Sequence, residues 1–268
     1  MTSLEDRDMG IFKSGGVVIA VKDSGETSRL ADVFTEQYGL IRVKAKGARR
    51  PESRFGAATD QLTYIQGVYY MREDENIAGL SAADVIMGFP NIHKDLIKFS
   101  YASGLAEVLS ANLPAGQPQK VLFNAFLSAL KDLEDIDKEI IEKFFWAHLL
   151  KFMSLLGYRP EFLICSGCSV GKSSDWMFSV ENGRIYCKDC SKSLRDSLFI
   201  QLDGGEARIL SIFISADRSV LSGLNVSDSQ MKTARAVIDA FRKYHTLPEN
   251  ELKSLRFMDQ VTKERTES

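Results

Sequence analysis

Residues 11–90 carry short apolar runs and a period-two alternation of apolar and polar residues, which is the pattern of β-strands. The segment 41–46 alternates strictly, so its apolar residues are expected to face a core while its three basic residues face solvent. The segment 28–38 is ambiguous, because its apolar residues have helical spacing but its neighbours are strand-like. Short strands over this length predict a small barrel or sandwich. We expect strands at 17–21, 41–46, 61–71 and 77–87, and at 28–38 if that segment is extended.

From residue 91 onward, apolar residues recur at every third or fourth position, which is the period of an amphipathic helix. His148 lies on the apolar stripe of one such segment, and we expect it to pack in a core rather than to bind a ligand. Gly157, with Pro160 just beyond, is expected to end that helix. The expected helices span 91–113, 122–133, 140–156, 204–215 and 229–246.

These patterns predict a multidomain protein of the α+β class, in which a small β-barrel or sandwich precedes a helical domain. The expected β-strand domain is residues 1–90. The expected helical domain is residues 91–258, with a cysteine-rich insertion at 162–192. The polar tail, residues 259–268, is expected to fray.

Charge is distributed unevenly along the chain. The protein has 34 Lys and Arg against 36 Asp and Glu, a net charge of −2, so any site for a polyanion must be local. Residues 42–54 carry six cations and one carboxylate, Glu52, so they net +5 and the rest of the chain nets −7. Outward cations on a strand, followed by a flexible loop bounded by Gly47 and Pro51, suit a phosphate backbone better than the alternative of a merely solvated face. The expected DNA-binding residues are Arg42, Lys44, Lys46, Arg49, Arg50 and Arg54.

Tyrosines lie close to this basic segment in the predicted barrel. Tyr64, Tyr69 and Tyr70 could stack on single-stranded bases, as aromatic residues do in oligonucleotide-binding barrels. The alternative is packing between neighbouring strands, and it is favoured for any one of the three.

The four cysteines form two Cys-x-x-Cys pairs separated by eighteen residues, with a hairpin expected between them at 178–186. Two such pairs bring four thiolates to one tetrahedral site, which suits Zn²⁺ best and an iron centre as the main alternative. Redox disulfides are a further alternative, which a reducing compartment disfavours. Four sulfur ligands leave no position open for water, so the Zn²⁺ is expected to be structural. The expected ligands are Cys165, Cys168, Cys187 and Cys190.

Sequence motifs of enzymes are missing. The sequence has no phosphate-binding P-loop, no His-Glu-x-x-His and no Gly-x-Ser-x-Gly, and its three scattered histidines form no triad. We therefore expect neither enzymatic activity nor a small-molecule substrate. The acidic N-terminus does not look like a secretory signal, and no apolar run reaches the length of a membrane span, so we expect a cytoplasmic protein without a membrane partner.

Short motifs follow one another in a set order along residues 11–258. They are Glu26-Thr27-Ser28-Arg29-Leu30 with Phe34-Thr35, then Gly39-Leu40-Ile41, Lys46-Gly47-Ala48-Arg49-Arg50 with Ser53-Arg54-Phe55, Leu155-Leu156-Gly157-Tyr158-Arg159-Pro160 before the first cysteine pair, and Leu252-Lys253-Ser254-Leu255-Arg256. In this order they resemble the RecO family of bacterial recombination mediators.

The resemblance implies an N-terminal oligonucleotide-binding (OB) barrel, with residues 28–35 as a strand, and a helical domain that carries a zinc knuckle. RecO-like proteins are not enzymes: they bind single- and double-stranded DNA and anneal complementary strands in DNA repair and recombination. They also engage the acidic C-terminal tail of the single-strand-binding protein and, with RecR, help to load RecA. The implied location is the bacterial cytoplasm, in association with the nucleoid.

A site for that acidic tail needs an apolar pocket rimmed by cations. Lys151 and Arg159 flank apolar residues near the end of the third expected helix, and we take them as candidates. The alternative, that Phe152, Leu155 and Leu156 are buried core, is favoured by their position on the apolar stripe. The competing function for the whole chain is a zinc-ribbon protein–protein adaptor that does not bind DNA directly.

Overall fold

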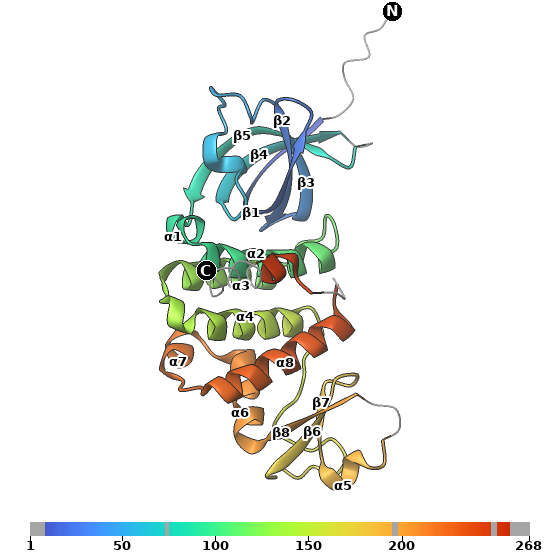
Figure 1. Ribbon diagram of the computed structural model, residues 1–268. Helices are drawn as coiled ribbons and strands as arrows, with labels where there is room; N and C mark the ends of the chain where they lie inside the picture. Colours follow the sequence, from blue (N-terminus) through green and yellow to red (C-terminus); the bar gives the residue numbers. More distant parts are fainter. Residues whose placement is uncertain (1–8, 73–74, 195–197, 248–250, 258–268) are drawn as a thin grey trace, which may run out of the picture. The chain divides into compact units, whose positions relative to one another are not determined.

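A computed structural model describes residues 9–72, 75–194, 198–247 and 251–257 (Figure 1). The chain forms two compact units, Met1–Glu134 and Asp135–Ser268. The expected tail, residues 259–268, lies outside the described residues.

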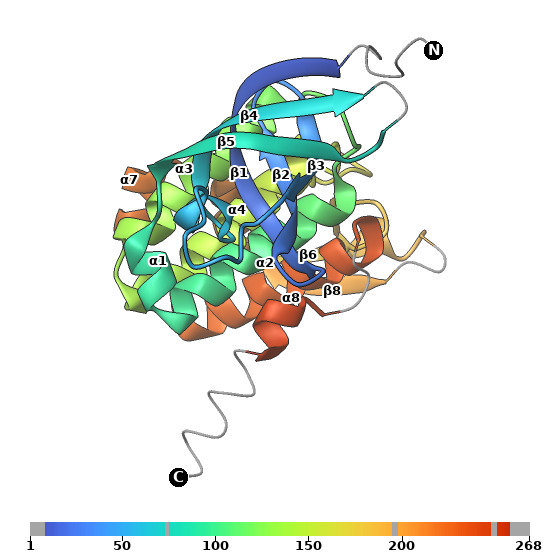
Figure 2. The same cartoon turned by 90° about the horizontal axis from the view of Figure 1, so that it is seen from above.

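The first unit contains a closed five-stranded barrel. Its strands are β1 (Met9–Ser24), β2 (Ser28–Thr35), β3 (Gly39–Ala45), β4 (Tyr64–Arg72) and β5 (Ala78–Met87). They close in the order β1-β2-β3-β5-β4, and Figure 2 shows β1 curving beside β4. All pairs are antiparallel except the short parallel contact between β3 and β5. This arrangement confirms a barrel rather than a sandwich.

Residues 28–35 form a strand, although their apolar spacing is helical. β2 pairs with β1 on one side and β3 on the other, so its backbone hydrogen bonds are made by the neighbouring strands. The expected alternation on β3 is confirmed at Val43 and Ala45, which are buried in the barrel core, while Ile41 packs against that core. Long-range pairing therefore overrides the local spacing.

The described part of the first unit also contains the short 3₁₀-helix η1 (Gly56–Thr59) and three α-helices, α1 (Pro90–Lys94), α2 (Leu96–Asn112) and α3 (Lys120–Asp135). The single helix expected over 91–113 is wrong, because Asp95 interrupts it. The Asp95 carboxylate accepts hydrogen bonds from the N–H groups of Ile97 and Lys98 and so caps α2 at its start.

The helices of this unit are joined to the barrel by backbone and aromatic contacts. The N–H of Gly116 donates to the carbonyl of Leu40 over 2.9 Å. Phe123 of α3 packs edge-on against Phe34 of β2, with ring centres 5.4 Å apart. The compact unit therefore extends past residue 90, at which the strands give way to helices, as far as Glu134.

The second unit combines helices with a small sheet. The helices are η2 (Lys138–Ile140), α4 (Ile141–Leu155), α5 (Lys188–Ser191), α6 (Gly204–Ser215), α7 (Arg218–Gly223) and α8 (Asp228–His245). The strands β6 (Asp175–Ser179), β7 (Arg184–Cys187) and β8 (Phe199–Asp203) form a sheet in the order β7-β6-β8. The expected hairpin is confirmed, whereas β8 and α7 were not predicted. His148 is 5% exposed beside Phe144 and Phe152, which confirms a packed histidine.

Candidate metal centre and nucleic-acid interface

The four cysteines converge beside the small sheet of the second unit. Cys187 ends β7 and Cys190 lies in α5, whereas Cys165 and Cys168 precede β6. All four Sγ atoms lie within 4.8 Å of one another, and those of Cys168 and Cys187 are 3.8 Å apart. A tetrahedral site with Zn–S bonds of about 2.3 Å needs sulfur separations of about 3.8 Å. The thiols are unbridged, so the cluster can hold a metal ion.

Backbone hydrogen bonds prepare the buried member of the cluster for metal binding. The Cys165 sulfur accepts from the N–H of Cys187 at 3.3 Å and of Gly167 at 3.4 Å. Burial raises the pKa of Cys165, but these N–H groups and that of Cys168 outweigh it and lower the pKa to about 6. Side-chain contacts with Cys187 and Cys168 raise the pKa of Cys190 to about 12. Mutual repulsion thus opposes four thiolates, and a divalent cation removes that penalty.

Gly167 allows the two cysteine pairs to approach each other. A Cβ atom at this position would lie 2.8 Å from both the Cβ and the Sγ of Cys190, closer than unstrained contact permits. The neighbouring N–H of Ser166 donates to the carbonyl of Ile185 over 2.9 Å, which ties the first pair to β7. The sequence pattern identified the cysteines but gave no reason for this glycine.

The six cations of residues 42–54 differ in what surrounds them. Arg42 donates from Nε and Nη2 to the two carboxylate oxygens of Asp32 at 2.7 and 3.0 Å, and this contact raises the pKa of Arg42. The Nη1 of Arg49 lies 3.4 Å from the Asp23 carboxylate. The other four have no carboxylate partner among the described residues, and we call them the unpaired cations: Lys44, Lys46, Arg50 and Arg54.

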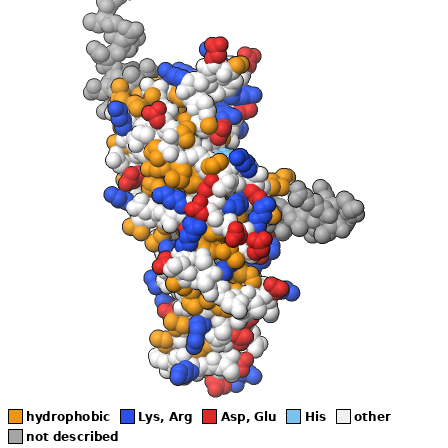
Figure 3. Space-filling view, turned by 90° about the vertical axis from the view of Figure 1, so that its left-hand side faces the viewer, with side chains coloured by type: hydrophobic (Ala, Val, Ile, Leu, Met, Phe, Trp, Pro, Cys, Tyr) orange, Lys and Arg blue, Asp and Glu red, His pale blue; other side chains and the backbone are white. Residues whose placement is uncertain are grey.

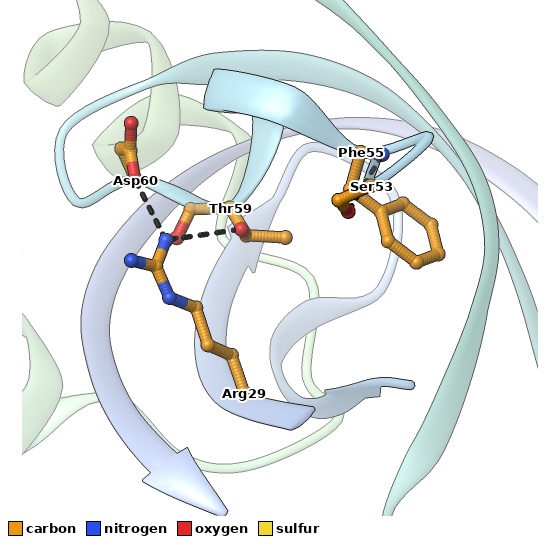
Figure 4. A network of polar contacts seen from close by, with 5 residues as sticks. All are labelled: Arg29, Ser53, Phe55, Thr59 and Asp60. Carbon is orange, nitrogen blue, oxygen red and sulfur yellow. Dashed lines mark hydrogen bonds and ion pairs between the residues drawn. The ribbon is translucent and has the colours of Figure 1, made fainter. Parts of the chain in front are cut away.

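The loop that the sequence predicts to be flexible is anchored to the barrel. Phe55 and Ala58 pack in the barrel core, and the Arg54 guanidinium lies 5.0 Å from the centre of the Phe55 ring. Arg29 of β2 holds the far end of the loop, where its Nη1 donates to Thr59 Oγ1 at 3.2 Å and to Asp60 at 2.7 Å (Figure 4). The unpaired arginines therefore extend from a fixed support. Arg29 was not among the predicted site residues.

The three tyrosines of β4 occupy different environments. Tyr69 is wholly buried and stacks on Phe12 of the neighbouring strand β1, which confirms cross-strand packing for this ring. Tyr64 packs edge-on against Phe123 of α3, not against a neighbouring strand. Tyr70 is half-buried and lines a cavity together with Lys44 and Lys46. Of the three rings, Tyr70 is thus the one beside the basic residues.

The candidate tail residues lie in and just after α4. Lys151 is half-buried and Arg159 is exposed. Phe152 is wholly buried, whereas Leu155 is 39% exposed. An apolar contact at this surface could therefore use Leu155 but not Phe152.

Two further observations concern the charges on one face of the molecule and the possibility of a membrane-spanning helix. Figure 3 shows one face of the molecule, on which Lys and Arg side chains are interspersed with Asp and Glu rather than gathered into one basic field. None of the helices in the described part of the chain has the length and hydropathy needed to cross a membrane.

Comparison with known proteins gives a consistent result over nearly the whole chain. The family model "Recombination protein O N terminal" matches residues 9–89, and "Recombination protein O C terminal" matches residues 93–256. The DNA repair protein RecO of Bacillus subtilis (strain 168) is 29% identical over 254 residues, which are 94% of this chain and 95% of that protein. The DNA repair protein RecO of Desulfitobacterium hafniense (strain DSM 10664 / DCB-2) is 30% identical over 183 residues, 68% of this chain and 65% of that protein. With its OB-type barrel, helical second part and cysteine cluster, the chain belongs to the RecO family of DNA repair and recombination proteins.

Proposed function

We propose that this protein is a non-enzymatic recombination mediator that binds single- and double-stranded DNA and anneals complementary strands. The observation that carries the proposal is the set of four unpaired cations on a closed barrel, in a chain whose family acts on DNA. With RecR, it would help to load RecA onto DNA coated by the single-strand-binding protein. It would act on the nucleoid in the bacterial cytoplasm.

Annealing follows from the same charges. Two complementary strands repel each other through their phosphates, and cations held between them offset that repulsion. Base pairing then supplies sequence specificity, so the protein needs neither a cofactor turnover nor a reacting side chain. Arg42 and Arg49 would contribute less than the unpaired cations, because each already contacts a carboxylate.

For the cysteine cluster we propose one structural Zn²⁺, bound by Cys165, Cys168, Cys187 and Cys190. The support is the fit between the sulfur separation and tetrahedral geometry, together with the N–H groups that favour a thiolate at Cys165. The ion would hold the two cysteine pairs together beside the small sheet and supply no reactive position.

For the partner tail we propose contact with Lys151 and Arg159, in which the cations meet acidic residues of the peptide and Leu155 meets its apolar end. A titration with a short acidic peptide ending in Pro-Phe tests this contact. Reversal of both cations, Lys151→Glu with Arg159→Glu, should weaken binding of the peptide. Equal binding to both proteins would assign the contact to another surface.

The DNA proposal is tested by fluorescence anisotropy with a labelled single strand at two salt concentrations. Binding should weaken as salt rises, because each neutralised phosphate releases counterions. Charge reversal at Lys46, Arg49 and Arg50 to Glu should weaken binding and flatten the salt slope by about 0.7 per lost phosphate contact.

A matched control is available on other surfaces. Lys94, Lys131 and Lys232 are exposed and have no ion pair with any described residue, so their reversal to Glu changes the net charge equally. This control should retain most of the affinity. Equal losses in the two triple variants would show a nonspecific charge effect, and no binding by the wild type would favour the protein–protein adaptor.

A further inference from the structure

The groove beside β3 combines two cations with an aromatic ring. It has a volume of about 590 Å³ and is lined by Lys44, Lys46, Tyr70, Ile77 and neighbouring residues of the β4–β5 connection. That volume is in the range of small-ligand sites, which is roughly 300–1,000 Å³. Ile77 is 40% exposed, so part of the wall is apolar and open to solvent.

Strand register places the ring and one lysine in a single row. Tyr70 of β4 is paired with Gly79 of β5, and Gly79 is paired with Lys44 of β3. Directly paired residues point to the same face of a sheet, and this is the outer face because Tyr69, the neighbour of Tyr70, is wholly buried.

Gly79 leaves room for the Tyr70 ring to lie across the sheet. A Cβ atom at residue 79 would overlap with the ring carbons Cζ, Cε1 and Cε2 of Tyr70. One face of the phenol ring therefore rests on the backbone of Gly79 while the side chain remains half-buried at the groove. A ring supported in this way is ordered before a ligand arrives, which reduces the entropy lost on stacking.

The charges of the groove indicate which part of a ligand enters it. The described residues that line the groove include two lysines and one carboxylate, Glu75. The carboxylate disfavours a phosphate group deep in the groove, whereas a neutral base is not repelled. The lysines suit the phosphates on either side of such a base.

We propose that this groove is a stacking site for one unpaired nucleobase, which lies on Tyr70 while Lys44 and Lys46 contact the adjacent phosphates. The inference rests on the proposed DNA binding and assigns its single-strand mode to this groove. Bases in a duplex are already stacked and cannot lie on the ring. Duplex DNA would use only the cations.

The test compares Tyr70→Leu with Tyr70→Phe, which keeps a ring, and with Tyr38→Leu, which removes a partly exposed tyrosine elsewhere on the barrel. The probes are an oligothymidylate, an abasic strand of equal length and charge, and a duplex. Tyr70→Leu should weaken oligothymidylate binding by about 5- to 140-fold, since one stacked base contributes roughly 1–3 kcal/mol. It should leave the salt slope and the binding of the other two probes unchanged. Tyr70→Phe and Tyr38→Leu should bind like the wild type.

The double variant Lys44→Gln with Lys46→Gln should weaken the binding of all three probes. It should also lower the salt slope by up to about 1.4 for single strands, because two phosphate contacts are lost. Salt-dependent binding that is equal in wild type and Tyr70→Leu overturns the stacking site and leaves the proposed function standing. Failure of the wild type to bind any probe overturns both.

A second measurement covers the case in which Tyr70→Leu does not fold. The wild-type protein is irradiated with an oligonucleotide that carries 5-iododeoxyuridine, and the adducts are mapped by mass spectrometry. An adduct on Tyr70 supports the site. Adducts confined to other residues overturn it.

Discussion

Four sulfur atoms within 4.8 Å of one another define the cysteine cluster, whereas the six cations of residues 42–54 are spread over β3 and the loop that follows. In the cluster each member matters because the others are present, since one ion needs all four ligands. In the basic segment each cation acts separately, and its contribution depends on whether a carboxylate from another strand already contacts it. Loss of one member should therefore be severe in the cluster and graded in the segment.

The largest effect is expected for Cys165→Ser, which replaces the buried ligand. Zinc binding is coupled to folding and contributes on the order of 10 kcal/mol in isolated zinc-finger peptides. Metal analysis of the purified variant should give a zinc content near zero, and circular dichroism should show loss of the small sheet. Ser166→Ala, between the same two cysteines, is the control and should keep one zinc per chain. A wild type without zinc, or with oxidised cysteine pairs, would contradict the metal assignment.

A smaller effect is expected for Gly167→Ala, which leaves all four ligands in place. The new methyl group would lie 2.8 Å from Cys190, so the second cysteine pair must move. Overpacking of this kind costs about 1–3 kcal/mol. Competition with a chelator should show weaker zinc retention than in the wild type. Gly171→Ala, where an added Cβ meets no neighbour, should have no effect.

In the basic segment, removal of a carboxylate should strengthen binding. Asp32→Asn releases Arg42 from its charged partner, so one more cation becomes available to phosphate. The affinity for a single strand should rise by a few-fold, equivalent to roughly 1 kcal/mol or less, and the salt slope should steepen by about 0.7. Asp84→Asn makes the same charge change at an exposed position of β5 without an ion pair among the described residues. If the two variants gain equally, the Asp32–Arg42 contact has no special role.

The smallest effect, on thermal stability, is expected for Asp217, which belongs neither to the cysteine cluster nor to the basic segment. Its side chain caps α7, and the hydrogen bond from the N–H of Val220 lowers the pKa of Asp217, followed in size by that from the Ser219 hydroxyl. A carboxylate with a lowered pKa stabilises the fold above its unfolded pKa and loses that contribution as pH falls through the folded value. Asp217→Asn should therefore lower Tm by about 1 °C at pH 7. Thermal scans should show the difference vanish below both pKa values. A difference that persists in acid would have another origin.

Sequence patterns predicted the elements whose signal is local. The two Cys-x-x-Cys pairs determine the sulfur cluster, because each pair needs only a tight turn. The helix predicted from about Gly204 to Ser215 is confirmed by α6, and in the structure Asp203 and Glu206 form a capping box at its start. The short strand β8 was missed, because its five residues become a strand only through pairing with β6.

The sequence patterns did not show which of the cations already contact a carboxylate and which are available to bind phosphate. A count of charges along residues 42–54 treats Arg42 and Lys44 alike. It does not include Asp32, the carboxylate partner of Arg42, because Asp32 lies ten positions earlier in the chain. A usable signal did exist, because pairing outward from the turn between Thr35 and Gly39 sets Asp32 opposite Arg42. No comparable rule predicts that Lys44 lies beside Gly79, since β3 and β5 meet in parallel across a long connection.

The edge-on contact between Phe34 and Phe123 has a practical consequence for dissecting the protein. Phe34 is wholly buried, and so is Phe123 of α3. A fragment that stops near residue 90 would remove Phe123 and also the backbone bond from Gly116 to β3. Exposing a large buried apolar side chain to water costs about 1.5–3 kcal/mol and leaves an exposed hydrophobic patch that promotes aggregation. A recombinant barrel that carries α1–α3 and ends near Glu134 should thus stay monomeric at concentrations at which the shorter fragment precipitates.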